Sequence, residues 1–504
     1  MSLKNKILNI GQILQKKKGM QQVSLMLLIT LITQAISMYK SAITASNFGA
    51  CVELDAYNFA NNLSTFFLTF VSTGITTVII PSYVRKADRK AIDTFLSVVF
   101  SIVGLLLVAI FAFRTQLVDI LTNREAEFGY YVNDLLLLTI LIQFFPALLG
   151  VTTAYYQCIG KFNFPKVVLL ISNIATMLVY LSLDKFTIYQ YLYVMLAGVL
   201  FQFVVDLVYA VKCGFCFRIT FDIHNTEYTK MCKIFIPTLI GTGIYKVNTM
   251  VDSLLSSNLG TGQLTILTYS TMVVGLVNSL IIGNLVIYVY PKIVAKMSIS
   301  LKECQKELYN YIMAFHVVVS LLIVGFITVG REFIGILYER GQFTAEAADA
   351  VYFCMCIYIF GQQANVIRDL LYRYFMADGD TQTTTKNGLM TSCINIICSF
   401  LMIRFLGVYG IAVGTVIAGM ISLCGIALRM KNKYGFTSGV GNCIKEILKT
   451  ECALICSIII VLLIKSLLLL SNDVLIFLIF GVLSVIVFGG ILLLLHSKAF
   501  KIEK

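Results

Sequence analysis

The chain has 504 residues, 58% of them hydrophobic, and its 39 Lys and Arg against 26 Asp and Glu give a formal net charge of +13 at pH 7. A helical span of a bilayer needs about 20 apolar residues, and many such stretches follow one another here. The longest polar gap, about residues 212–230, is too short for an inserted soluble domain. Most basic residues fall in every second gap, so the charge indicates membrane orientation and attraction to anionic membrane lipids, not a nucleic-acid partner.

Fourteen apolar stretches predict fourteen transmembrane helices. They cover residues 22–48, 57–83, 92–113, 130–155, 164–184, 187–211, 231–257, 264–291, 307–330, 347–376, 385–406, 408–428, 447–469 and 473–495. With the N-terminus placed inside, 30 Lys and Arg lie in cytoplasmic segments, 7 lie in outer ones and two lie within spans. This bias predicts that both termini are cytoplasmic. Residues 1–21 are predicted to be a Lys-rich cytoplasmic amphipathic lead-in, not a cleaved signal peptide.

A short pattern of residues occurs twice along the chain. Gly49 closes the first span and Pro81 ends the second; Gly260 closes the seventh and Pro291 ends the eighth. The two Gly-to-Pro separations are 32 and 31 residues. Six helices are an even number and keep both halves in one orientation, so the pattern predicts a parallel repeat, as in transporters that rock two bundles around a central site.

The expected fold is therefore an all-α polytopic membrane protein of about fourteen transmembrane helices. We predict an N-lobe at 22–211 and a C-lobe at 212–430, each of six helices related by the parallel repeat. Two further helices and a cytoplasmic tail occupy 431–504.

Two lysines lie inside spans, where a charge is costly and by default suggests function. Lys40 lies about eighteen residues from the cytoplasmic end of the first span, and Lys246 about fifteen residues into the seventh. Each is thus the buried cation of the first helix of its half. Two cations facing one cavity would suit a phosphate or pyrophosphate headgroup. The alternative is that both ammonium groups snorkel to the outer interface.

A cluster of oxygen-bearing side chains follows. Asn248 and Asp252 are four residues apart on the seventh span, Asn395 and Ser399 repeat that spacing on the eleventh, and Thr415 lies on the twelfth. Carboxylate, amide and hydroxyl oxygens without His or Cys suit a hard cation such as sodium. The alternative is ordinary hydrogen bonding between helices.

Other polar residues give weaker signals. Asp206 in the sixth span and Asp134 in the fourth are further candidates, ranked below Asp252. The three histidines are scattered and no phosphate-binding GxxxxGK[ST] loop occurs, so we expect neither an enzyme nor a nucleotide-driven motor. The fourteen cysteines are interpreted as packing residues, not as metal ligands or disulfides.

Four stretches together resemble a known family. They are Phe48-Gly49-Ala50 with Asp55-Ala56-Tyr57; Leu259-Gly260-Thr261-Gly262 with Thr265, Leu267 and Tyr269; Leu337-Tyr338-Glu339-Arg340-Gly341-Gln342-Phe343-Thr344; and Arg368-Asp369 with Arg373-Tyr374-Phe375-Met376-Ala377-Asp378-Gly379-Asp380-Thr381-Gln382-Thr383. Over about residues 20–430 the chain resembles the MviN/MurJ-type flippases, a branch of the multidrug/oligosaccharidyl-lipid/polysaccharide exporter superfamily.

The resemblance implies two six-helix lobes around a central cavity, with spans 13 and 14 forming a groove for a polyprenyl tail. It implies a flippase that moves lipid II, the undecaprenyl-pyrophosphate-linked peptidoglycan precursor, across the bacterial cytoplasmic membrane by alternating access. The partners it implies are the lipid-linked saccharide and membrane lipids. We expect a monomer, open to association with the cell-wall synthesis machinery.

The resemblance also assigns residues. Asp55 matches the family's acidic residue after the first span, and Lys40 one of its cavity cations. Together with Lys246 and Gln34 they are the residues expected to bind the substrate. Gln34 stands with Leu68 and Met272 where well-known members carry cavity arginines. For the family's sodium site Asp252, Asn395 and Thr415 match, a carbonyl near Ile411 is implied, and Ser399 replaces a frequent carboxylate. Sodium is the one cofactor expected.

Three alternatives stay open at this point. One is a flippase for another lipid-linked oligosaccharide of capsule or exopolysaccharide. Another is cation-coupled efflux of small drugs, against which a basic cavity counts, since most such drugs are cationic. The last is a membrane enzyme acting on lipid-linked sugars, against which the lack of a His/Asp or paired-carboxylate site counts.

Overall fold

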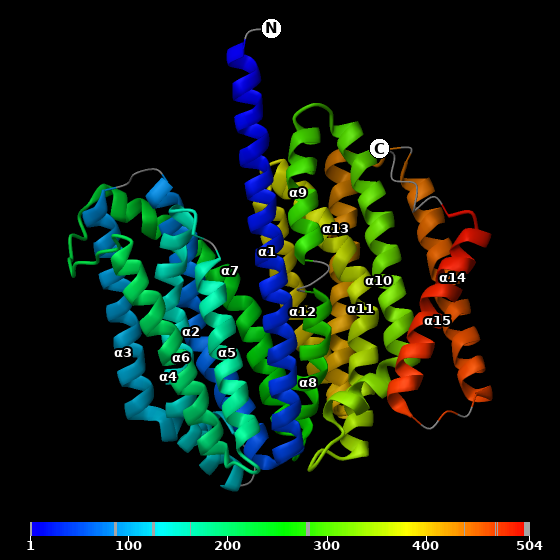
Figure 1. Ribbon diagram of the computed structural model, residues 1–504, viewed down its shortest axis with the longest axis horizontal. Helices are drawn as coiled ribbons and strands as arrows, with labels where there is room; N and C mark the ends of the chain where they lie inside the picture. Colours follow the sequence, from blue (N-terminus) through cyan, green and yellow to red (C-terminus); the bar gives the residue numbers. More distant parts are fainter. Residues whose placement is uncertain are drawn as a thin grey trace. The chain divides into compact units, whose positions relative to one another are not determined.

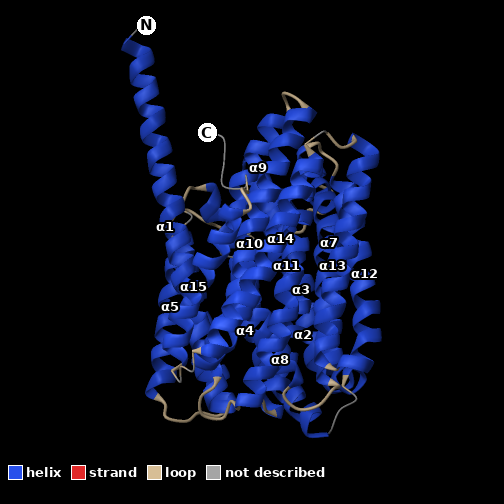
Figure 2. Cartoon of the chain, turned by 90° about the vertical axis from the view of Figure 1, so that its right-hand side faces the viewer, coloured by secondary structure: helices blue, strands red, loops and turns tan. Residues whose placement is uncertain are grey.

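The computed structural model describes residues 3–84, 88–122, 126–161, 163–278, 283–437, 439–468, 470 and 472–497. This part of the chain contains fifteen helices and no strand (Figure 2). The helices are α1 (Leu3–Phe48), α2 (Val52–Val84), α3 (Arg89–Leu121), α4 (Ala126–Cys158), α5 (Phe164–Ser182), α6 (Ile188–Lys212), α7 (Thr226–Ser257), α8 (Gln263–Val277), α9 (Gly283–Met297), α10 (Leu301–Tyr338), α11 (Ala345–Ala377), α12 (Thr381–Leu406), α13 (Val408–Tyr434), α14 (Val440–Leu467) and α15 (Asp473–Leu494). The all-helical prediction is confirmed.

One predicted boundary differs from the observed helices. The lead-in predicted at 1–21 belongs, from Leu3 on, to the same helix as the first span, because nothing in its sequence breaks α1. The predicted eighth span, 264–291, overlaps α8 and α9, and residues 279–282 between them lie outside the described residues. The cytoplasmic tail predicted at 498–504 lies outside the described residues.

Local sequence sets several helix starts. Thr187 begins α6 with a capping box, its hydroxyl accepting from the Gln190 amide while the Gln190 side chain accepts from the Thr187 amide. Thr344 caps α11 and Asn472 caps α15 through their side-chain oxygens. Such caps satisfy N–H groups that the first turn of a helix leaves without partners.

The chain folds into two compact units. Unit 1 comprises residues 1–44 and 59–246, and unit 2 comprises 45–58 and 247–504. α1, α2 and α7 therefore each contribute to both units (Figure 1). The predicted lobe boundary at 211/212 stays a prediction, since the observed division falls within α7.

Unit 1 is organised by α4, which packs against α3 and α6, while α6 also packs against α5 (Figure 1). In unit 2, α10 packs against α11, α14 and α15, and α13 packs against α11 and α12. A large apolar core lies along α10 and α11 and includes Ile323, Tyr374 and Phe375, none of which is exposed. The two helices after the repeat, α14 and α15, thus belong to the body of unit 2.

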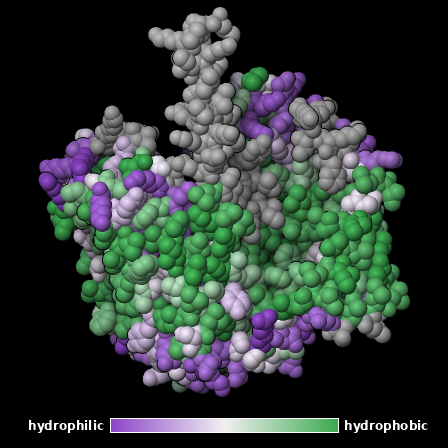
Figure 3. All heavy atoms as spheres, in the orientation of Figure 1, coloured by the Kyte–Doolittle hydropathy of each residue, from purple (hydrophilic) through white to green (hydrophobic). Residues whose placement is uncertain are grey.

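The outward helix faces are apolar. On α3, Leu105, Val108 and Phe111 are 65–71% exposed, and on α15 Val482 and Ile486 are 61% and 63% exposed. On the face in view in Figure 3, apolar side chains cover the middle of the helices and hydrophilic ones gather at their ends. Within the described residues, ten helices are long and apolar enough to cross a membrane. Such surfaces are stable in lipid, where exposed apolar groups cost nothing.

Candidate functional site: a buried cation, a docked corner and an oxygen cluster

Lys40 lies in unit 1 and is turned toward α5. Its Nζ donates to Asn173 Oδ1 at 2.9 Å and to Thr176 Oγ1 at 3.1 Å. Both acceptors are neutral, and the structure describes no carboxylate against this ammonium. Two of its three N–H donors are thus engaged while the positive charge is not neutralised.

Two other residues predicted to bind the substrate, Gln34 and Lys246, make fewer polar contacts than Lys40 does in the part of the chain that the structure describes. Gln34 is half-buried on α1, six residues before Lys40. Lys246 is also half-buried, and its Nζ lies 5.9 Å from the ring centroid of Tyr245. No contact in the described part of the chain joins Lys40, Lys246 and Gln34, and their role as substrate residues remains a prediction.

Asp55 is fully buried and caps the first turn of α8. Oδ2 accepts from the Gly262 amide at 2.7 Å, and Oδ1 accepts from the Thr265 amide at 2.9 Å and the Thr265 hydroxyl at 2.7 Å. The N-cap residue of α8 is Gly262, which has no side chain to cap the helix itself. The carboxylate therefore satisfies amides at the positive end of the α8 dipole. With no accessible surface, Asp55 offers nothing to a ligand in this conformation.

Residues 45–58, which we call the corner, comprise the end of α1, the short turn that follows it and the start of α2. They belong to unit 2 and approach other parts of that unit closely along the backbone. The Gln342 amide donates to the Ser46 carbonyl at 2.8 Å. Gly49 has φ of +66°, and a Cβ there would overlap the Gln342 carbonyl; Gly341 has φ of +60°, and a Cβ there would overlap the Ser46 carbonyl. Both positions need glycine, for the left-handed conformation and for the close approach.

Three of the four stretches that carry the family resemblance meet at the corner, whereas the fourth, residues 368–383, contacts α13 through Asp378 and Asp380, which pair with Lys433. Tyr269 stacks on Tyr338, with ring centroids 4.6 Å apart, and Phe343 lies 5.8 Å from Tyr269. All three rings are almost completely buried. Their recurring pattern therefore has a structural explanation, since it builds the surface that receives the corner.

The predicted oxygen cluster is assembled in unit 2. Ser399 Oγ donates to Asn395 Oδ1 at 2.9 Å, and Asn395 Nδ2 donates to Thr415 Oγ1 at 3.3 Å. The Thr415 hydroxyl also donates to the Ile411 carbonyl at 3.0 Å. The Ser399 hydroxyl stands beside the Asp252 carboxyl. α7, α12 and α13 thus each contribute to one group of oxygens.

Two oxygens of this cluster have no partner. Asp252 Oδ1 and Asn248 Oδ1 are buried and accept no hydrogen bond. The helices beneath them are in close contact, because a Cβ on Gly414 would lie 2.6 Å from the Ser399 amide nitrogen. A rigid set of oxygens with one carboxylate and two unsatisfied acceptors is chemically suited to a monovalent hard cation.

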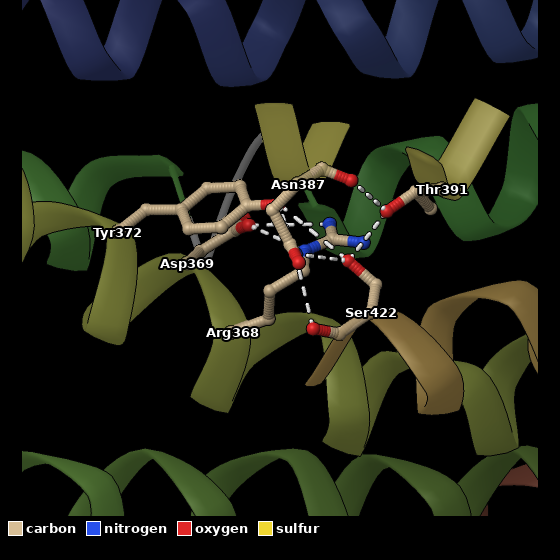
Figure 4. Close-up of polar contacts among 6 residues, drawn as sticks. All are labelled: Arg368, Asp369, Tyr372, Asn387, Thr391 and Ser422. Carbon is tan, nitrogen blue, oxygen red and sulfur yellow. Dashed lines mark hydrogen bonds and ion pairs between the residues drawn. The ribbon is translucent and has the colours of Figure 1, made fainter. Parts of the chain in front are cut away.

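A second polar network, centred on Asn387, has no counterpart in the sequence-based site prediction. Its Nδ2 donates to the Tyr372 hydroxyl at 2.9 Å and to Ser422 Oγ at 2.8 Å, and the Thr391 hydroxyl donates to Ser422 Oγ at 2.6 Å (Figure 4). The Arg368 guanidinium lies next to it, 3.2 Å from Asp369 Oδ1 and over the Tyr372 ring. Asn387 and Thr391 are four residues apart, as Asn395 and Ser399 are. This shared spacing is the sequence signal from which the second network could have been predicted.

Comparisons with known proteins agree with this architecture. The family model of the lipid II flippase MurJ matches residues 44–483. The chain belongs to the MurJ family. It is 24% identical over 409 residues to a probable lipid II flippase MurJ of Rickettsia prowazekii, covering 78% of this chain and 80% of that protein. The Vibrio cholerae protein of the same name is 22% identical over 422 residues, which cover 78% of this chain and 79% of that protein.

Solved structures show the same fold. A lipid II flippase MurJ in an inward closed conformation superposes with a TM-score of 0.80 at 21% identity, covering 94% of this chain and 99% of that one. An inward-facing multidrug resistance MATE family transporter gives 0.64 at 13% identity, covering 79% and 94%. The predicted family is confirmed. MurJ proteins are transporters, so the chain is a multi-pass transporter of the bacterial inner membrane and not an enzyme, as predicted.

Proposed function

We propose that this chain flips lipid II, or a closely related polyprenyl-diphosphate-linked saccharide, across the bacterial cytoplasmic membrane by alternating access. Membership of the MurJ family supports lipid II as the substrate. The observation that carries the proposal for this chain is Lys40, a membrane-embedded ammonium held by two neutral acceptors.

The physical need is charge compensation. A diphosphate that leaves water for the interior of a membrane protein loses its hydration, and a fixed cation offsets part of that cost. At 4 Å and an effective dielectric constant of about 20, one ion pair contributes about 4 kcal/mol. Asn173 and Thr176 hold the ammonium in place without neutralising it, so its field remains available to an anionic headgroup.

Lys40 can be tested against a matched lysine. Lys40→Ala should abolish lipid II flipping in proteoliposomes and fail to complement a bacterium depleted of its lipid II flippase. Lys40→Arg should retain part of the activity. Lys166→Ala is the control, because Lys166 Nζ also links α5 to α1, donating to Thr30 Oγ1 at 2.9 Å. Full activity of Lys40→Ala at normal abundance would contradict the proposal.

The same assays address the substrate. Wild type should complement loss of lipid II flipping and translocate lipid II in vesicles. If it instead translocates only another polyprenyl-diphosphate saccharide, the headgroup assignment is wrong while the flippase class stands.

Sodium is proposed as the ligand of the oxygen cluster formed by Asp252, Asn395, Ser399 and Thr415. The unpartnered oxygens of Asp252 and Asn248 support this, and a single carboxylate neutralises a single positive charge. A ligand that binds only the folded state stabilises it, by about 2.7 kcal/mol at one hundred times its dissociation constant.

The sodium site is tested by thermal unfolding in sodium chloride and in choline chloride at equal ionic strength. Wild type should unfold at a higher temperature in sodium, and Asp252→Asn should lose that difference. Asp369→Asn is the control, since its carboxylate lies outside the cluster and pairs with Arg368. A sodium effect that survives in Asp252→Asn would leave the cluster as interhelical hydrogen bonding.

A further inference from the structure

Asp206 on α6 is a buried carboxyl that the proposed function does not use. The residue is 1% exposed, and neither Oδ1 nor Oδ2 has a hydrogen-bond partner. The hydroxyl of Tyr156 on α4 comes close, but it donates to the Asp206 backbone carbonyl at 2.6 Å. The side chain is thus buried with no cation and no backbone amide of the described residues against it, and the polar group beside it is the Gln202 side chain on the same helix.

Two other buried carboxyls that the structure describes have several donors. Asp55 accepts three hydrogen bonds. Glu446 accepts from the Lys449 ammonium at 2.8 Å and from the Ser497 hydroxyl at 2.8 Å. Asp206 has no such set of donors: neither of its oxygens makes a hydrogen bond of normal geometry, and the polar side chain beside it is Gln202.

Burial keeps solvent from the Asp206 side chain, and the nearby part of α6 is apolar, although Asp206 itself does not line the cavity beside that part. Phe203 and Leu207 on the same helix line a cavity of about 350 Å³ between α3, α4, α6 and the segment after α6. Its one polar lining residue is Thr152, whose hydroxyl is engaged with the Leu149 carbonyl at 3.1 Å. An unpaired carboxylate in such a medium costs several kcal/mol, and a carboxyl so placed takes up a proton instead.

The titratable groups around Asp206 leave this conclusion unchanged. From α4 the facing group is Tyr156, which is neutral and hydrogen-bonded. On α6 the Gln202 amide, which does not titrate, lies beside the carboxyl, and Tyr209 lies one turn toward the C-terminal end of the helix. The contact that α5 makes here is Phe164, which stacks on Tyr209 at 3.9 Å.

Lys161, a cation in contact with α6, is engaged with other groups. Its ammonium donates to the Tyr209 hydroxyl at 2.8 Å and to Cys213 Sγ at 3.2 Å, at the exposed end of the helix. Tyr209 and Lys161 therefore form a polar link between the solvent and the turn that holds Asp206.

We propose that Asp206 is a proton-binding site of unit 1. In the conformation described, the carboxyl holds a proton on one oxygen. When α4 and α6 separate enough to admit water, the O–H bond breaks, the proton passes to water and the carboxylate remains. A proton is the ligand because one carboxyl can bind it alone, whereas a metal cation needs several more oxygens, which this site does not offer. Binding and release at this site would add a proton to the transport cycle. The proposal for Asp206 holds whichever lipid-linked saccharide the protein moves.

Infrared spectroscopy of the reconstituted full chain tests the protonation directly. Wild type labelled with carboxyl-¹³C aspartate should show an isotope-shifted carbonyl band of a protonated carboxylic acid. The band should be absent from Asp206→Asn and present in Asp252→Asn, and Glu446→Gln should leave it unchanged. If wild type has no isotope-shifted band, or Asp206→Asn keeps the whole of it, the proposal is wrong. The labelled wild type gives this result even if the variant does not fold.

Proton release is tested in proteoliposomes with the membrane potential clamped at zero. An imposed pH gradient should change the rate of lipid flipping at least about twofold in wild type and leave Asp206→Asn unresponsive. An equal response in both proteins would overturn a role for Asp206 in transport. If no flipping of any lipid is detected, the proposed function fails, and the infrared measurement still decides the proton site.

Discussion

The Asp55 carboxylate and Thr265, 210 residues apart in the sequence, are joined by two hydrogen bonds of 2.7 and 2.9 Å. The start of α8, which has no capping side chain of its own, is thereby capped by a residue that follows the first span, near the position equivalent to Thr265 in the predicted repeat. We expect Asp55→Ala to leave the Gly262 and Thr265 amides buried and unpaired, at a cost of about 1–3 kcal/mol for each.

The corner should then open more often. With Ala50→Cys as the reporter in a cysteine-free chain, an impermeant thiol reagent should react severalfold faster when Asp55→Ala is added. Thr268→Ala is a suitable control, because its hydroxyl bonds within α8 to the Leu264 carbonyl. Unchanged reactivity would show that the cap does not hold the corner.

Glycine at position 341 is expected to be required for a steric reason. Gly341 and Gly379 both have positive φ, +60° and +82°, so alanine strains both backbones by about 1–2 kcal/mol. Only Gly341 also approaches another backbone, that of Ser46, whereas a Cβ on Gly379 meets nothing within 4 Å. Gly341→Ala should therefore lower the unfolding temperature and increase corner reactivity more than Gly379→Ala. Equal effects of the two substitutions would contradict the close-contact explanation.

Asp380 should stabilise the start of α12 in a pH-dependent way. Its hydrogen bond to the Lys433 ammonium, together with that from the Thr383 amide, lowers the pKa of the Asp380 carboxyl to about 2. A carboxyl whose pKa is depressed on folding contributes stability above its ordinary pKa of about 3.9 and loses it as the pH falls toward 2.

Two substitutions separate the cap from the ion pair at this position. Asp380→Ala should cost about 1 kcal/mol at pH 7 through the lost N-cap, and Asp380→Asn should cost less because an amide oxygen still caps. Thermal unfolding at pH 7 and pH 3 measures both, and the difference between wild type and Asp380→Ala should shrink at the lower pH. A difference that grows on acidification would refute the assignment.

The orientation predicted from the basic residues is open to a labelling experiment. Cysteines introduced near Arg89 and Lys302 in a cysteine-free chain should be protected from impermeant thiol reagents in intact cells, and cysteines near Ala126 and Thr344 should react. The opposite pattern would place both termini outside.

The sequence was most informative about features that depend on local spacing. Helical spans follow from stretches of apolar residues, and the four-residue spacing of Asn395 and Ser399 predicts the shared face on which their side chains are hydrogen-bonded. The depth of Lys40 in its span likewise follows from counting residues along one helix. The prediction groups Asp252 and Thr415 with Asn395 and Ser399 as polar residues within spans, and the family resemblance implies the same residues.

The sequence did not predict those features of the site that depend on contacts between residues far apart in the chain. The role of Asp55 as a substrate contact stays a prediction, whereas its role as a helix cap could not be predicted, because the amides it binds are 207 and 210 residues away and no local pattern indicates them. Asp206 was ranked below Asp252 because burial without a partner is a property of three-dimensional packing alone.

The way the corner belongs to unit 2 constrains how relatives can be recombined. A hybrid joined at the loop after α6 would take residues 45–58 from one parent, and the turn at Gly341 and the start of α8 from the other. The close backbone contacts between the corner and the turn at Gly341 would then join residues from two different parent proteins. Hybrids that transplant the corner along with the second half should be produced in folded form far more often than those that divide the parents at a single junction.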